Sequence, residues 1–182
     1  MKLFSDYHLH PQGHRLQPYT RELLQPWAEQ ARKLRLGDIA LTDHDRYHQG
    51  IDFGEIERLR EANPDLKIRA GIELDNDPVH SAAGRAWVEK NWDRLDFVLG
   101  SVHFLRGDWA FDHAGEEAEF SRRDIDEVYA DYFARIGAMA ESGLVDCMGH
   151  LDLVKIFGFR ARKNIDDLLD AVLSTIRRAD LA

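Results

Sequence analysis

The sequence contains a single cysteine, Cys147, among 182 residues. One thiol excludes an internal disulfide and an all-cysteine zinc site, so a bound metal would need histidine and carboxylate ligands. No apolar run approaches the roughly 20 residues that a membrane-spanning helix requires. The first residues also lack the apolar stretch and cleavage site of a secretory signal. We therefore expect a cytoplasmic protein that does not bind membranes.

Positive charge is also scarce. The chain has 24 Lys and Arg against 33 Asp and Glu, a net charge of −9, which repels extended nucleic acids over most of the surface. Repeats, low-complexity tracts and Gly/Ser-rich linkers are missing, whereas 44% apolar and 31% charged residues are typical of a globular protein. We expect one compact domain over residues 1–182 that acts on a small substrate.

Several catalytic motifs are absent as well. No glycine-rich dinucleotide or phosphate-binding loop follows the first predicted strand. Ser101 lacks the Gly-x-Ser-x-Gly setting of a serine hydrolase. Cys147 and His150 are three positions apart on one predicted strand, so their side chains point to opposite faces and do not form a nucleophile–base pair. We expect Cys147 to lie in the core.

What the sequence does contain is a regular alternation of strand and helix patterns. Five short apolar segments predict strands: Leu3–His8, Asp38–Thr42, Lys67–Leu74, Phe97–His103 and Leu144–His150. Helical periodicity predicts helices from a Thr20 cap to Leu34, and over Phe53–Ala62, Ala82–Trp92, Ile125–Ser142 and Asn164–Arg178. This order predicts an α/β fold with a parallel sheet, either doubly wound or closed into a barrel, and the missing phosphate-binding loops favour the barrel.

Imidazoles and one carboxylate occur where the predicted strands end: His8 and His10, His44, Glu73, His103 and His150. Because the carboxyl ends of parallel strands meet at one rim, these side chains are expected to converge. A spacing of two places the first pair on one side of the strand, and His14 lies in the same loop. Imidazoles with a carboxylate favour zinc, iron or manganese. We expect His48, His80 and His113 to be solvated.

A basic loop runs from Lys155 to Lys163, with four positive charges and no acid. Arginine forms bidentate contacts with phosphate oxygens, and lysine supplies a compact charge. We therefore expect Lys155 and Arg160 to orient a phosphoester substrate, whereas Arg162 and Lys163 are as readily explained as solvated residues.

Five of these segments together resemble the PHP (polymerase and histidinol phosphatase) superfamily, and most of all its monofunctional histidinol-phosphatase branch. They are residues 6–10 (DYHLH), 42–44 (TDH), 71–73 (GIE), 100–103 (GSVH) and 149–152 (GHLD). The resemblance implies a distorted TIM-like (β/α)7 barrel and two or three divalent metal ions (Zn, Fe or Mn). It also implies hydrolysis of L-histidinol phosphate to L-histidinol and phosphate in histidine biosynthesis.

The resemblance also implies a role for each site residue. His8 and His10 match ligands of one metal, Glu73 bridges it to a second metal held by His103 and His150, and His14 and His44 match ligands of a third. A metal-bridging hydroxide would attack phosphorus while Arg160 and Lys155 neutralise the phosphoryl oxygens. Asp43 and Asp152 are candidates to orient the histidines from outside the ligand set, or to accept backbone N–H groups instead.

The family pattern ends in a further strand carrying Asp-x-His, and this sequence stops at Ala182 before that strand. We therefore expect a C-terminally incomplete barrel of about the first five βα units. Only the second metal retains its whole expected ligand set. Such a chain would expose one edge of its sheet, and an oligomer contact or a partner subunit would cover that edge. The alternatives are a PHP-family phosphoesterase acting on a nucleotide or nucleic-acid end, and a non-catalytic metal-binding or assembly remnant.

Overall fold

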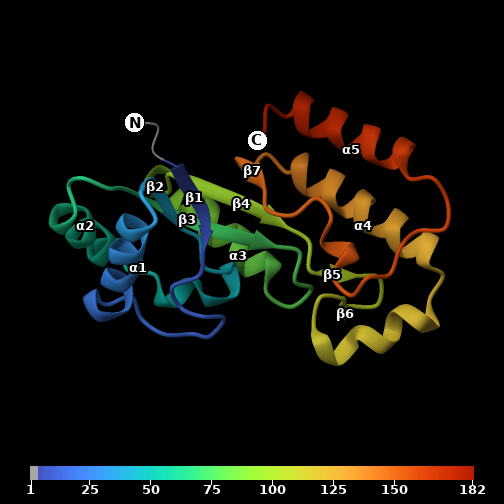
Figure 1. Cartoon of the computed structure of the whole chain (residues 1–182), viewed down its shortest axis with the longest axis horizontal. Helices are drawn as coiled ribbons and strands as arrows, with labels where there is room; N and C mark the ends of the chain where they lie inside the picture. Colours follow the sequence, from blue (N-terminus) through green and yellow to red (C-terminus); the bar gives the residue numbers. More distant parts are fainter. Residues whose placement is uncertain (1–3) are drawn as a thin grey trace. The chain divides into compact units, whose positions relative to one another are not determined.

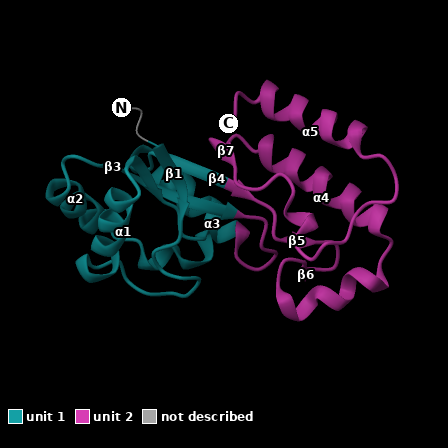
Figure 2. Cartoon of the chain, viewed as in Figure 1, with its two compact units in different colours: residues 1–74, 82–99 teal, residues 75–81, 100–182 magenta. Residues whose placement is uncertain are grey.

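The computed structural model describes residues 4–182 (Figure 1). The chain divides into two compact units, coloured separately in Figure 2. Unit 1 contains residues 1–74 and 82–99, and unit 2 contains residues 75–81 and 100–182. The single domain expected over residues 1–182 stays a prediction.

Unit 1 is built from alternating strands and helices. Its elements are β1 (Phe4–Leu9), α1 (Arg21–Lys33), β2 (Leu36–Leu41), η1 (Asp45–Gly50), α2 (Phe53–Ala62), most of β3 (Lys67–Asp75), α3 (Ser81–Asn91), η2 (Trp92–Arg94) and the start of β4 (Phe97–Ser101). β1 and β3 both pair in parallel with β2. The sheet therefore brings the carboxyl ends of three strands of unit 1 to one edge.

Apolar side chains from both helices and strands form the core of unit 1. Helix α1 begins as its sequence predicts, since the Thr20 side chain accepts a hydrogen bond from the Leu23 amide at its amino end. Its inward face carries Leu24, Ala28 and Ala31, which pack with residues of β2, α2 and β3: Ile39, Leu41, Ile56, Leu59, Ile68 and Ala70. This burial fixes the strands that carry the candidate ligands.

Unit 2 is organised around one apolar helix. Its elements are the hairpin β5 (Phe104–Leu105) and β6 (Trp109–Ala110), η3 (Ala114–Arg122), α4 (Ile125–Ala140), β7 (Cys147–Met148), η4 (Leu153–Lys155) and α5 (Asp166–Arg178). Seven residues of α4 are buried: Val128, Tyr129, Tyr132, Phe133, Ile136, Met139 and Ala140. Gly143, at a φ of +71°, follows the end of α4, in the left-handed conformation that favours glycine after a helix.

The predicted fold class is confirmed. The main sheet has the order β1-β2-β3-β4-β7, which follows the order of these strands along the chain, and helices connect successive parallel strands. β7 joins the end of β4 within unit 2, where the amide of Gly149 donates to the carbonyl of Gly100. Residues 4–182 therefore hold five strands of the expected TIM-like arrangement.

The five predicted strands and five predicted helices are all present in the structure and differ from it mainly at their ends. Leu3, the first residue of the first predicted strand, lies outside the described residues. The fifth strand is two residues long, Cys147–Met148, rather than Leu144–His150, and Cys147 is half-buried rather than in the core. The β5–β6 hairpin and η3 were not predicted, because each strand of the hairpin is too short to show a period. Among residues 4–182, no helix has both the length and the apolar character needed to cross a membrane.

A matched pair of leucine substitutions tests the core of unit 1. Leu24 is 0% exposed, whereas Leu34, just after the same helix, is 58% exposed. We expect Leu24→Ala to lower the free energy of unfolding by about 2–5 kcal/mol, because it leaves a cavity, and Leu34→Ala by no more than about 0.5 kcal/mol. Urea unfolding followed by circular dichroism measures both. Equal losses would contradict this description of the core.

Candidate metal centre

Glu73 is the centre of the candidate site. It lies near the carboxyl end of β3 and is 0% exposed. Its amide donates to the Asp43 carbonyl over 3.0 Å, and an isolated parallel bridge links it to His44. The chain just after β2 therefore runs beside the end of β3, which brings the side chain of His44 to the Glu73 carboxylate.

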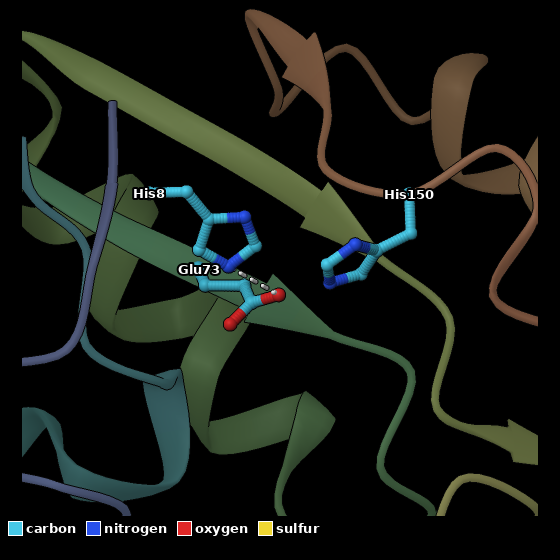
Figure 3. A group of neighbouring side chains, drawn as sticks. All are labelled: His8, Glu73 and His150. Carbon is cyan, nitrogen blue, oxygen red and sulfur yellow. Dashed lines mark ion pairs between the residues drawn. The ribbon is translucent and has the colours of Figure 1, made fainter. Parts of the chain in front are cut away.

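Three imidazoles meet this carboxylate within unit 1. Nε2 of His8 lies 3.3 Å from Oε1, and Nε2 of His10 lies 3.4 Å from Oε2. Nδ1 of His44 lies 3.1 Å from Oε2. Figure 3 shows the pair of His8 and Glu73, and it also labels His150, which belongs to unit 2. The period-two spacing of the first two histidines therefore places both on the side of the strand that faces Glu73.

The imidazoles are also packed against one another. The rings of His10 and His44 are stacked, with centroids 4.7 Å apart, and the ring of His14 lies 4.8 Å from the first and 5.2 Å from the second. The ring of His8 lies 5.0 Å from that of His10. Four of the histidines expected from the sequence therefore gather in unit 1.

This arrangement fits a divalent cation. One carboxylate carries one negative charge, so it balances one imidazolium, and further protonated rings about 5 Å away would repel one another. A divalent ion instead accepts lone pairs from several neutral imidazoles and neutralises the buried carboxylate. Ligand atoms of His10, His44 and Glu73 all lie within 4.8 Å of one another, which is compact enough for one ion to bind them.

Asp43 fixes the loop that follows β1. Its carboxylate accepts hydrogen bonds from the Gln12 amide, at 3.0 and 3.2 Å, and from the Tyr19 hydroxyl at 2.8 Å. Burial raises the pKa of Asp43 to about 7, against the opposite effect of these two donors. Of the two roles that the sequence leaves open for Asp43, these contacts therefore favour the one in which its carboxylate accepts hydrogen bonds from the loop. That loop positions exposed His14, at a φ of +60°.

Unit 2 contains a second group of candidate ligands. His103 is buried, and its ring centroid lies 5.5 Å from that of half-buried His150. The hydroxyl of Tyr132 donates to the carbonyl of His150 over 2.9 Å and accepts from the Leu153 amide at 3.3 Å. Burial raises the pKa of Tyr132. Tyr132, on the buried side of α4, therefore also holds the backbone beside the candidate ligand His150.

Sequence reasoning missed Asp75, which is 0% exposed in unit 2. Its Oδ2 lies 3.0 Å from Nδ1 of His103. The available signal was its position, two residues after Glu73, because alternate residues of a strand share a face. It was not recognised, since the predicted strand ended at Leu74.

The basic loop carries Arg160 at the surface of unit 2. Arg160 is exposed, and its Nη1 donates to the carbonyls of Lys155 and Phe159 over 3.1 and 3.0 Å. Asp152 lies just before the 3-10 helix η4, and its side chain is 74% exposed and lies 3.6 Å from Nζ of Lys155. Its role stays a prediction.

The remaining histidines lie outside these groups. His80 and His113 are exposed, as expected for solvated side chains. His48 is instead half-buried, and its ring lies 5.6 Å from that of Trp87.

Comparison with known proteins decides the family. The model of the PHP domain matches residues 6–182. This chain belongs to the PHP domain family. The resemblance carried by the histidine and carboxylate motifs is thereby confirmed.

One relative of this PHP domain and one solved structure of the same fold are described as histidinol phosphatases. A Deinococcus radiodurans protein named "Probable histidinol-phosphatase" is 43% identical over 98 residues, which cover 51% of this chain and 35% of that protein. A crystal structure described as the "putative histidinol phosphatase hisK" of Listeria monocytogenes has a TM-score of 0.67 and 15% identity, covering 98% of this chain and 79% of the other. The first match thus spans about a third of the relative's length, and the second shows a shared fold.

Substitution of Glu73 tests the metal centre of this PHP domain. Glu73→Gln keeps the size of the side chain and removes the charge that a divalent ion would neutralise. We expect it to weaken binding of Mn²⁺ or Zn²⁺ in isothermal titration calorimetry by more than about tenfold. Glu57→Gln is the control, because the Glu57 side chain is 61% exposed and pairs with Arg60. Wild-type affinity in both variants would contradict a metal centre at Glu73.

Proposed function

We propose that this PHP domain is a metal-dependent phosphomonoesterase that hydrolyses L-histidinol phosphate to L-histidinol and phosphate. The observation that carries the proposal is the meeting of three imidazoles at the buried carboxylate of Glu73. A cytoplasmic location and a role in histidine biosynthesis belong to the same proposal.

The residues of unit 1 would hold the first metal ions. His8, His10 and His44 surround Glu73, and the ring of His14 lies tilted beside those of His10 and His44. Bound divalent ions would supply a hydroxide at neutral pH and neutralise charge on the phosphoryl group. Mixed imidazole and carboxylate ligands suit zinc, iron and manganese, and we propose that two or three ions bind. We also propose His103 and His150 as ligands, as the family resemblance implies.

The basic loop would hold the phosphoryl oxygens. The hydrogen bonds of Arg160 to the Lys155 and Phe159 carbonyls use Nη1, and the guanidinium also has donors on Nη2 and Nε. Those carbonyl contacts fix the side chain without using all its donors. Lys155 would add a second positive charge. Each would stabilise the negative charge that develops as the phosphoester bond breaks.

The choice of substrate follows the names of the two relatives and the charge of this chain. A net charge of −9 disfavours an extended nucleic acid and leaves a small phosphoester as the better substrate class. Both relatives carry the name of histidinol phosphatase, one with 43% identity over half of this chain. We therefore prefer histidinol phosphate to a nucleotide.

Release of inorganic phosphate tests this activity directly. We expect the 182-residue chain, loaded with Mn²⁺ or Zn²⁺, to release phosphate from L-histidinol phosphate, and a chelator to abolish the release until metal is restored. A metal-loaded chain that releases none would refute the proposal for this chain. Release from a nucleotide but not from histidinol phosphate would refute the substrate and retain the phosphoesterase.

Arg160→Ala tests the basic loop. We expect the KM for the phosphoester to rise by about tenfold or more, since a charge-assisted hydrogen bond to phosphate is lost. Arg162→Ala is the matched control, because Arg162 lies in the same loop and pairs with Asp124 and Asp126. Steady-state kinetics at saturating metal measure both. An unchanged KM in the Arg160 variant would exclude its contact with substrate.

A further inference from the structure

The dipeptide Asp75-Asn76 contacts His103 from two directions. Both residues belong to unit 2, in which His103 is 6% and Asp75 0% exposed. Oδ2 of Asp75 lies 3.0 Å from Nδ1 of the ring. A buried carboxylate beside one ring nitrogen favours the proton on that nitrogen, because the N–H can then donate toward an oxygen that water does not reach.

Asn76 contacts the backbone rather than the ring. Its Oδ1 accepts hydrogen bonds from the amides of His103, at 2.9 Å, and of Phe104, at 3.0 Å. Its Nδ2 donates to the carbonyl of Phe104 over 2.6 Å. Three hydrogen bonds of one side chain therefore fix the chain at His103, between the end of β4 and the start of β5.

We propose that Asp75 and Asn76 are positioning residues that hold His103 with its proton on Nδ1 and its Nε2 lone pair ready for a metal ion. This inference rests on the metal ligand role of His103 in the proposed function, and not on the identity of the substrate. A carboxylate or carbonyl bound to the second nitrogen of a ligating imidazole fixes the ring and increases its basicity. Neither residue needs to touch the substrate.

The same unit contains a matched pair outside the proposed ligand set. Oδ2 of Asp77 lies 3.0 Å from Nδ1 of His80, the same separation as in the pair of Asp75 and His103. The His80 side chain is 50% exposed, and Asp77 also accepts from the amides of Val79 and His80. Asp77→Asn is therefore a control with the same change of charge and the same type of partner.

Two measurements on Asp75→Asn and Asp77→Asn test the proposal. Proton–nitrogen correlation spectra of the histidine rings in the metal-free protein report which nitrogen of His103 carries the proton. The His103 signal is assigned by its loss in His103→Gln. We expect the Nδ1–H form in the wild type and a shift toward Nε2–H in Asp75→Asn.

Titration with Zn²⁺ should show about 10- to 100-fold weaker binding in Asp75→Asn and a less than twofold change in Asp77→Asn.

The outcomes separate this inference from the proposed function. An Nε2–H form of His103 in the wild type would overturn the positioning role without any variant, even if Asp75→Asn did not fold. Wild-type zinc affinity in folded Asp75→Asn would overturn it as well. By contrast, the expected spectra and zinc affinities with no release of phosphate by the wild type would refute the proposed function and leave the positioning role supported.

Discussion

A buried carboxylate surrounded by imidazoles is the constraint on which the rest of this structure depends. Glu73 is fully excluded from solvent, and an ionised carboxylate in such a place is costly unless other groups compensate its charge. Its partners come from segments far apart in the sequence: His8 from β1, His10 just beyond it, and His44 after β2. The parallel pairing of β1, β2 and β3 makes this meeting possible, because it brings their carboxyl ends to one edge.

Most of the unit 1 group could be predicted from the sequence for simple geometric reasons. Strand periodicity places His8 and His10 on one side, and the rule that parallel strands end at one edge brings Glu73 and His44 to them. The start of α1 could also be predicted, because Thr20 is a typical capping residue. Its side chain accepts a hydrogen bond from the Leu23 amide. Strand periodicity and helix caps are local patterns, so they can be identified in the sequence alone.

The features that were missed depend on contacts between distant residues. Tyr132 belongs to the apolar stripe of α4, and no local pattern shows that its hydroxyl bonds the carbonyl of His150, 18 positions away. Asn76 is an ordinary loop residue in sequence, yet it holds the backbone of His103. Asp152 lies two positions after His150 in the sequence, yet its exposed carboxylate lies near Lys155. Polar residues bond according to tertiary position, which periodicity does not encode.

The central claim is that this chain binds divalent metal through imidazoles gathered at Glu73. The most direct measurement is X-ray absorption spectroscopy of the chain loaded with one equivalent of Zn²⁺, because the scattering pattern of imidazole distinguishes it from water and carboxylate. We expect at least two imidazole ligands per zinc in the wild type, and fewer in His10→Ala. A zinc shell made only of oxygen ligands in the wild type would contradict it.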